Sequence, residues 1–184
     1  MRFLGLLGTA GSKVLGSVLG HVGRHLGRVV FASSGWTVGL WDTTVPSPLI
    51  GDMKKVPPSR AGAMQCTFSV ELYNGKKADT TLQHIKAVFH LPGGGTYSAN
   101  IYDPQARAEL TSLRLPARAL VTKRLWINVF STREVSGELL VSLARAERVV
   151  FAARYPSGWP YRKQIYLRGA SGHNGSRFGN QTGT

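Results

Sequence analysis

Apolar residues recur at steps of three and four near the start of the chain, which predicts an amphipathic helix over residues 1–31. This stripe comprises Leu4, Leu7, Gly11, Leu15, Val18, Val22, Leu26 and Val29. Arg24 and Arg28 fall off the stripe, and no acidic residue precedes Asp42. The segment also holds seven glycines, and each disfavours an isolated helix by about 1 kcal/mol relative to alanine. We therefore expect the helix to form on a surface against which it docks.

From residue 36 onward the apolar period changes to two, which is typical of β-strands. Residues 65–73 place Cys66, Phe68, Val70 and Leu72 on one expected core face, and residues 80–91 do the same with Ile85, Ala87, Phe89 and Leu91. Further strands are predicted at 36–41, 96–102, 110–115, 119–131, 148–155 and 161–167, with a register break near Asn128. Residues 136–147 leave helix and strand open, and Ser136 is a candidate helix N-cap.

Turn residues predict how two pairs of these strands connect. Asn74-Gly75 is a strong hairpin signal, because both residues tolerate positive φ, so the strands at 65–73 and 80–91 should pair. The turn at 156–160 should pair 148–155 with 161–167. About seven or eight short strands with frequent turns favour a β-sandwich. We therefore divide the chain into a basic, Gly-rich amphipathic segment (1–35), a β-sandwich domain (36–168) and a Gly/Ser/Asn-rich flexible tail (169–184).

Two stretches carry a resemblance to a known type of domain. Phe68-Ser-Val-Glu-Leu-Tyr-Asn-Gly-Lys, followed by Leu82-Gln-His-Ile-Lys-Ala-Val-Phe, resembles the early hairpin of immunoglobulin-like sandwiches in uncharacterised bacterial proteins. Val150-Phe-Ala-Ala-Arg-Tyr-Pro-Ser-Gly-Trp-Pro-Tyr is similar to their final hairpin. The Cys-Trp-Cys pattern of antibody domains is absent, and a jelly roll would use a similar strand count. The resemblance implies a mostly-β, immunoglobulin-like or jelly-roll-type antiparallel sandwich preceded by an amphipathic helical segment, and it implies no activity.

The charge balance favours anionic partners. Lys and Arg number 23 against 9 Asp and Glu, for a net charge of +14. Such a charge attracts phosphate backbones, anionic lipid surfaces and acidic proteins. Four pairs of adjacent basic residues are the candidate anion-binding positions: Lys54 and Lys55, Lys76 and Lys77, Lys123 and Arg124, Arg162 and Lys163. Nearby aromatic residues, Trp159 and Tyr161 among them, could stack on single-stranded nucleic acid. In the alternative interpretation these cations only solvate strand edges and loops.

Residues suited to catalysis or metal binding do not form a recognisable constellation. His21 and His25 have the i, i+4 spacing of a helical metal site but no third ligand nearby. His84 and His90 fall on one face of a predicted strand, too far apart for one metal ion. Cys66 lies on an apolar face, where an inert buried thiol is expected. The nine acids are scattered singly, so no catalytic carboxylate pair stands out. We expect no catalytic residue, no metal and no cofactor.

The leading functional interpretation is a non-enzymatic docking protein. Residues 1–31 would bind an anionic membrane surface or a protein partner, with the apolar stripe buried and the cations near acidic groups. No apolar stretch is long enough to span a bilayer, so we expect a cytoplasmic or peripheral membrane location. The alternatives are a structural subunit of a larger assembly such as a virion, in which the chain forms a homo-oligomer, and a nucleic-acid-binding module that uses the basic pairs.

Overall fold

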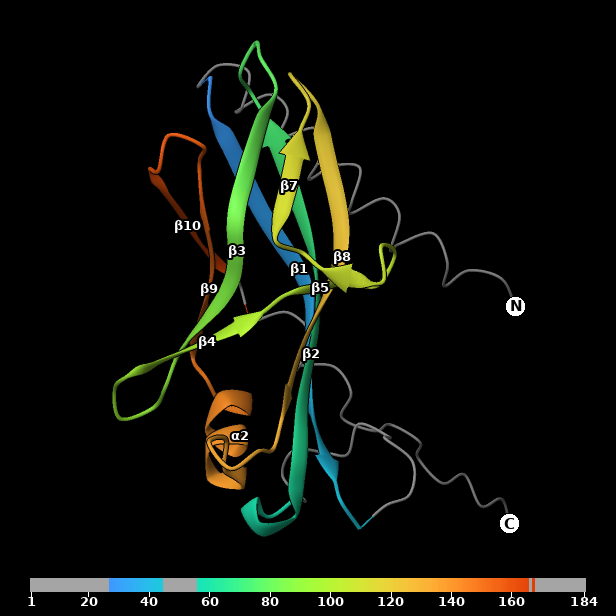
Figure 1. The fold of residues 1–184 in the computed structure, drawn as a ribbon, viewed down its shortest axis with the longest axis vertical. Helices are drawn as coiled ribbons and strands as arrows, with labels where there is room; N and C mark the ends of the chain where they lie inside the picture. The colour runs from blue at the N-terminus through green and yellow to red at the C-terminus, as the bar shows by residue number, and fades with distance from the viewer. Residues whose placement is uncertain (1–26, 45–55, 166, 168–184) are drawn as a thin grey trace, which may run out of the picture.

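The computed structural model describes residues 27–44, 56–165 and 167, and they form two packed antiparallel β-sheets (Figure 1). The first sheet has the strand order β1-β2-β8-β5-β6, and the second has the order β10-β9-β3-β4, with β7 also paired to β3. The strands are β1 (Val29–Asp42), β2 (Ala61–Asn74), β3 (Thr80–His90), β4 (Thr96–Asn100), β5 (Tyr102–Asp103), β6 (Ala108–Glu109), β7 (Ser112–Leu115), β8 (Leu120–Phe130), β9 (Arg148–Arg154) and β10 (Pro160–Ile165). The chain is therefore a mostly-β sandwich, as the alternating pattern predicts.

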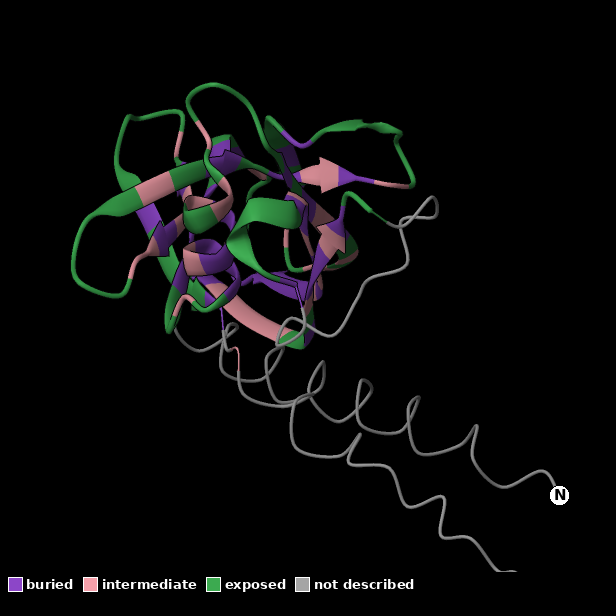
Figure 2. Ribbon diagram, turned by 90° about the horizontal axis from the view of Figure 1, so that it is seen from below, coloured by how far each residue is buried: buried purple, intermediate pink, exposed green. Residues whose placement is uncertain are grey.

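The core lies between the two sheets, where the buried positions gather in Figure 2. The predicted inward face of β2 is confirmed, since Cys66, Phe68, Val70 and Leu72 are all at most 1% exposed. On β3, Ile85, Ala87 and Phe89 are buried as expected, whereas Leu91 follows the strand and is only half buried. Burying a large apolar side chain contributes about 1.5–3 kcal/mol, so this interlayer contact is the main source of stability.

The predicted hairpin at Asn74-Gly75 is wrong, because β2 and β3 belong to different sheets. The Asn74 side chain is fully buried and does not sit at the corner of a two-residue turn. Its amide nitrogen donates to the carbonyl oxygens of Ala78, Leu115 and Pro116 at 2.9–3.1 Å, and its oxygen accepts from the Lys76 amide at 3.1 Å. These bonds hold a connection that crosses from one layer to the other.

The first strand starts earlier than the sequence pattern predicts. Val29, assigned to the helical stripe, is instead the first residue of β1, where it is buried and lies opposite Asn74. The sandwich therefore begins at residue 29, not at 36, because pairing with β2 overrides the helical spacing. A register shift between Ser34 and Thr37 interrupts the ladder at Gly35, whose φ is +65°. The other stripe residues, Leu4 to Leu26, lie outside the described residues.

Strand β8 runs without the predicted register break. Its ladder with β2 is continuous from Leu120 to Phe130. Leu125, Ile127 and Val129 all point into the core, so Asn128 points outward and Phe130 is 60% exposed. Inward and outward side chains alternate along β8 because its ladder with the neighbouring strand β2 has no register shift.

The segment after β8, for which the sequence allowed either helix or strand, is a helix. Helix α2 spans Gly137–Ala144, and the Ser136 hydroxyl accepts from the Leu139 amide at 3.3 Å, which confirms Ser136 as the N-cap. The helix lies at the lower end of the sandwich in Figure 1 and contacts the short 3-10 helix η1 (Pro58–Arg60). Leu140 and Leu143 are among its buried residues. In the described part of the chain, no helix combines the length and apolarity that crossing a membrane requires.

Candidate anion-binding face

The outward surface of the second sheet collects basic side chains from three strands. We call this the basic face and define it by Lys86, Arg148, Arg154 and Arg162, together with His84 and His90. The ladder sets these neighbours: Lys86 lies opposite Ala152, which in turn lies opposite Arg162, and His90 lies opposite Arg148. Because alternate residues of a strand project to the same side, all four cations leave the core and face solvent together.

A bulge in β3 keeps this face in register. The β3–β9 ladder shifts between Gln83 and Lys86, and His84 adopts a φ of 53°. A left-handed backbone is uncommon outside glycine, and the extra residue lets Leu82 and Ile85 both point into the core. His84 and Lys86 are consequently both exposed and line the same hollow. His84 and His90 line two different hollows that adjoin each other on this sheet, and the bulge lies between them.

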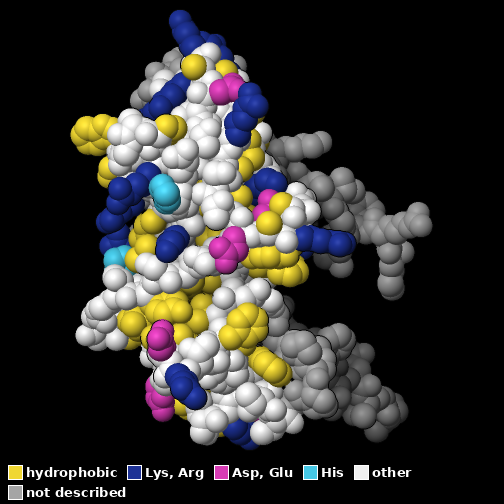
Figure 3. Space-filling model, viewed as in Figure 1, with side chains coloured by type: hydrophobic (Ala, Val, Ile, Leu, Met, Phe, Trp, Pro, Cys, Tyr) yellow, Lys and Arg dark blue, Asp and Glu magenta, His cyan; other side chains and the backbone are white. Residues whose placement is uncertain are grey.

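Two adjoining hollows run across the basic face. Their volumes are about 370 and 510 Å³, and both are bordered by Val88, Ser98, Ala152 and Arg162. The hollows are thus lined by small side chains such as Ser98 and Ala152 and bordered by the cations of the basic face. Figure 3 shows Lys, Arg and His side chains gathered over the side where β9 and β10 lie. No Asp or Glu of the described residues lines either hollow.

The cations of the basic face form no ion pair with a carboxylate of the described residues. The ion pairs among described residues lie elsewhere: Arg60 with Asp42, Arg114 with Asp79 at 2.6 Å, and Lys123 with Asp103 at 2.8 Å. None of Lys86, Arg148, Arg154 and Arg162 forms an ion pair with a carboxylate in that part of the chain. An anion on this face would therefore meet cations that no ion pair among the described residues neutralises, and the acid that borders it is Glu109, which lines a neighbouring hollow with His84 and Lys86.

The paired acids are firmly held by their own partners. Hydrogen bonds from Arg60 and Thr44 lower the pKa of Asp42 to about 2. Burial raises the pKa of Asp103, but hydrogen bonds from the Lys123 ammonium and the Ala106 and Gln105 amides outweigh it, so the net shift is downward. Both carboxylates stay ionised and engaged, and neither is available to neutralise the basic face.

The structure separates most of the predicted anion-binding positions. Lys54 and Lys55 lie outside the described residues. Lys76 sits over the Tyr155 ring, with its Nζ 4.6 Å from the ring centroid, and Lys77 is exposed on the β2–β3 connection. Lys123 is bound to Asp103, whereas Arg124 belongs to β8 in the first sheet. None of these described residues contributes to the basic face.

Among the predicted pairs that the structure describes, Arg162 and Lys163 alone reach the hollows. Arg162 lines both, and Lys163 borders one of them while its Nζ lies 5.8 Å from the Tyr161 ring. Sequence reasoning missed Lys86, Arg148 and Arg154. Neighbouring residues of a strand point to opposite faces, so adjacent basic pairs were the wrong signal. The useful signal was basic residues at alternate positions, as in His84, Lys86 and His90.

The other candidate groups offer little chemistry. Cys66 is buried, and burial raises the pKa of its thiol far above the usual range, so the nucleophilic thiolate is disfavoured. Across residues 27–44 and 56–165, no three His, Cys, Asp or Glu side chains cluster as a metal site. His21 and His25 lie outside these ranges.

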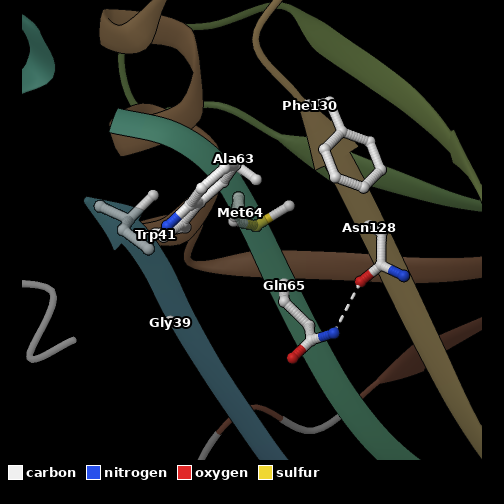
Figure 4. Close-up of a pocket in the computed structure, with 8 residues that line it drawn as sticks. Gly39, Trp41, Ala63, Met64, Gln65, Asn128 and Phe130 are labelled. Atoms are coloured by element: carbon white, nitrogen blue, oxygen red, sulfur yellow. Dashed lines mark hydrogen bonds between the residues drawn. The ribbon is translucent and has the colours of Figure 1, made fainter. Parts of the chain in front are cut away.

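A further hollow, on the first sheet, is apolar. It encloses about 410 Å³ and is lined by Gly39, Leu40, Trp41, Ala63, Met64, Gln65, Asn128 and Phe130 (Figure 4). The Gln65 amide donates to the Asn128 side-chain oxygen at 3.0 Å. The described residues that line it include no charged side chain, so this hollow offers shape and apolar contact but no electrostatic attraction for an anion.

Comparison with known proteins adds little to this description. Neither a family model nor a curated protein matches the chain. Two solved structures are similar at a TM-score of 0.33 each. The ApaA protein of Bordetella pertussis is 10% identical, with 76% of this chain and 90% of that chain covered. An uncharacterized β-sandwich protein from Clostridium difficile 630 is 14% identical, with 76% and 86% covered. Neither likeness assigns a family or an activity.

Proposed function

We propose that this chain is a non-enzymatic binding protein that holds an extended, phosphate-bearing polyanion on its basic face. One observation carries the proposal: four cations that form no ion pair with any described carboxylate share one sheet face, and no carboxylate of the described residues lines the two hollows between them. A surface with one sign of charge raises the local concentration of the opposite ion and speeds its association.

The spacing of the cations favours a chain of anions over a single small one. Arg148 and Arg154 stand six residues apart in β9, which corresponds to about 20 Å along a strand. A single phosphate group hydrogen-bonds to donors within about 3 Å, so it could not engage both ends. A polymer lying along the hollows could contact Arg148, Arg154, Lys86 and Arg162 in turn.

The first test is binding of inorganic polyphosphate, which offers the phosphates alone. We expect Lys86→Ala/Arg162→Ala to weaken binding by about 2 kcal/mol, or roughly 30-fold, because each cation near an anionic surface contributes about 1 kcal/mol. The logarithm of the binding constant should fall with the logarithm of salt at a slope of roughly −3 for four contacts, and roughly −1.5 after two are removed. Calorimetric titration at several salt concentrations measures both quantities.

A matched control removes the same charge away from the basic face. Arg133 and Arg145 are exposed and flank α2, beyond the hollows. Arg133→Ala/Arg145→Ala should leave the affinity within about twofold of the original chain, since distant surface charges are largely screened in salt. Equal losses in the two double variants would show that only net charge matters, and the basic face would then not be the binding site.

The docking role of residues 1–31 is a second proposal, motivated by the acid-free stripe of the sequence. We expect the full chain, but not a chain that starts at Gly27, to sediment with anionic vesicles and to resist salt in part. The truncation must spare Val29, because that residue is buried in β1. If both forms sediment equally, the segment is not the anchor.

Two further proposals concern the type of sandwich and its assembly. We infer an immunoglobulin-like form of the sandwich from the passage of the chain between layers at Ile101 and from the closing β9–β10 hairpin. A homo-oligomeric assembly, as in a virion subunit, would appear as a defined oligomer in light scattering.

A further inference from the structure

We propose that the polyanion is a single-stranded nucleic acid, and that Trp159 stacks on one of its bases at the end of the basic face. This inference rests on the proposed function and names its ligand. It follows from the exposure of Trp159, the hydrogen bonds that hold its turn and the position of the next residue, Pro160, beside Arg154 and Arg162.

Trp159 is the most exposed large apolar side chain in the described part of the chain. It is 73% exposed, compared with 60% for Phe130 and 41% for Leu120. Another tryptophan of the sandwich, Trp36, is buried and packs against Phe68 with ring centroids 5.6 Å apart. An indole left in water exposes a large flat apolar surface, and such a surface suits a stacking partner.

The turn that carries Trp159 is held in place before any ligand arrives. The Tyr155 amide donates to the Trp159 carbonyl at 2.9 Å, and the Gly158 amide donates to the Tyr155 carbonyl at 2.8 Å. Gly158 has a φ of +84°, which glycine adopts without strain. Tyr155 is itself anchored, since its ring lies 5.7 Å from that of Tyr161. A preorganised turn lowers the entropy lost on binding.

Trp159 directly precedes a residue that lines the basic face. The residue after it, Pro160, lines the larger hollow with Arg154 and Arg162, and Pro160 lies opposite Arg154 in the ladder. In Figure 1 the β9–β10 turn lies at the upper left, at the tip of the hairpin that forms one edge of the second sheet. A phosphate chain that contacts Arg154 and Arg162 therefore brings its neighbouring groups within reach of the indole.

A single-stranded nucleic acid has both a phosphate for the cations and an exposed base for the indole. Its phosphates match the cations, and its bases present open faces for stacking, a combination typical of surfaces that bind single strands. A duplex keeps its bases stacked inside, and polyphosphate has no rings. Acidic proteins have carboxylates but seldom place a ring beside each one. A vesicle surface is flatter than two hollows that lie between rims of charge.

The experiment compares the full chain with Trp159→Ala, using an oligothymidylate of about twenty nucleotides, which exceeds a typical single-strand site. We expect Trp159→Ala to weaken oligothymidylate binding about tenfold, as removal of one stacked base contact does. Polyphosphate binding should change less than about twofold, since it has no ring to stack. Trp159→Phe should restore most of the lost affinity because it keeps a stacking face. Phe130→Ala, the exposed aromatic on the first sheet, is the matched control and should have no effect.

Other results would overturn the stacking of Trp159 on a base without rejecting the basic face as a polyanion site. If Trp159→Ala binds the oligonucleotide as tightly as the original chain, or if an abasic strand of equal charge binds equally well, no base is stacked. If Trp159→Ala loses binding to phosphatidylserine vesicles but not to the oligonucleotide, the ligand is a membrane. In each case polyphosphate binding that depends on Lys86 and Arg162 would still support the basic face. Loss of that dependence would instead remove the proposed function itself.

Discussion

Replacing Asn74 by aspartate should destabilise the folded chain by about 3–5 kcal/mol at pH 7. The Asn74 amide nitrogen donates to three carbonyl oxygens, those of Ala78, Leu115 and Pro116. Aspartate has nearly the same shape but no donor there, so it would place a buried negative oxygen against three carbonyls. The acceptor for the Lys76 amide would remain, which makes the loss of donation the main effect.

Urea unfolding, followed by circular dichroism, measures this effect. The folded state should disfavour a buried, unpaired carboxylate, so the pKa of the introduced aspartate should be raised on folding. The folded variant would then bind its proton more tightly than the unfolded chain, and the penalty should shrink as the pH falls from 7 toward 4.

Asn128→Asp is the matched control for this change. Asn128 is exposed, and its side-chain oxygen only accepts, from Gln65, so aspartate keeps the bond and should cost less than about 0.5 kcal/mol. Equal stabilities for the two variants would mean that the Asn74 bonds do not hold the crossing between the sheets.

The second large effect is expected at Gly137, the first residue of α2. A Cβ at this position would lie inside van der Waals contact with the Pro58 carbonyl oxygen and only 2.8 Å from the carbonyl carbon. Both atoms are backbone atoms of η1, so they cannot turn aside. Overpacking of this kind costs about 1–3 kcal/mol, sometimes more, while alanine gains up to about 1 kcal/mol over glycine in a helix.

We therefore expect Gly137→Ala to lower stability by roughly 2 kcal/mol, or about 4–8 °C in Tm for a chain of this size. Helix propensity alone predicts the opposite sign, which makes differential scanning calorimetry decisive. Glu138→Ala, an exposed change in the same turn, is the control and should shift stability by less than about 1 kcal/mol. A Gly137→Ala chain that melts above the original would show that α2 and η1 are not in close contact.

Several elements could be derived from the sequence because their signals are local. Alternation in β2 identified its core face, and Ser136 marked the start of α2. The β9–β10 turn paired its own flanking strands, since Gly158 adopts the positive φ that such a turn needs. In each case the deciding residues lie within a few positions of one another, so the pattern already contains the structure.

The errors arose where a distant segment decided the outcome. Asn74-Gly75 has the composition of a tight hairpin, but carbonyls more than forty residues away in Leu115 and Pro116 bind the Asn74 side chain instead. Val29 fits a helical stripe, but the edge of β2 offers its backbone a strand partner. Local preference is worth less than a set of buried hydrogen bonds.

The sequence by itself determined that this protein is a basic, mostly-β chain with strands of known inward face. It could not determine which cations stand together, since Lys86, Arg148 and Arg162 come from three strands that only the second sheet places side by side. Strand order is set by packing and hydrogen bonds between remote segments, whereas alternation is set by the pleat of each strand alone. The composition therefore revealed the charge, and the tertiary structure decided where it gathers.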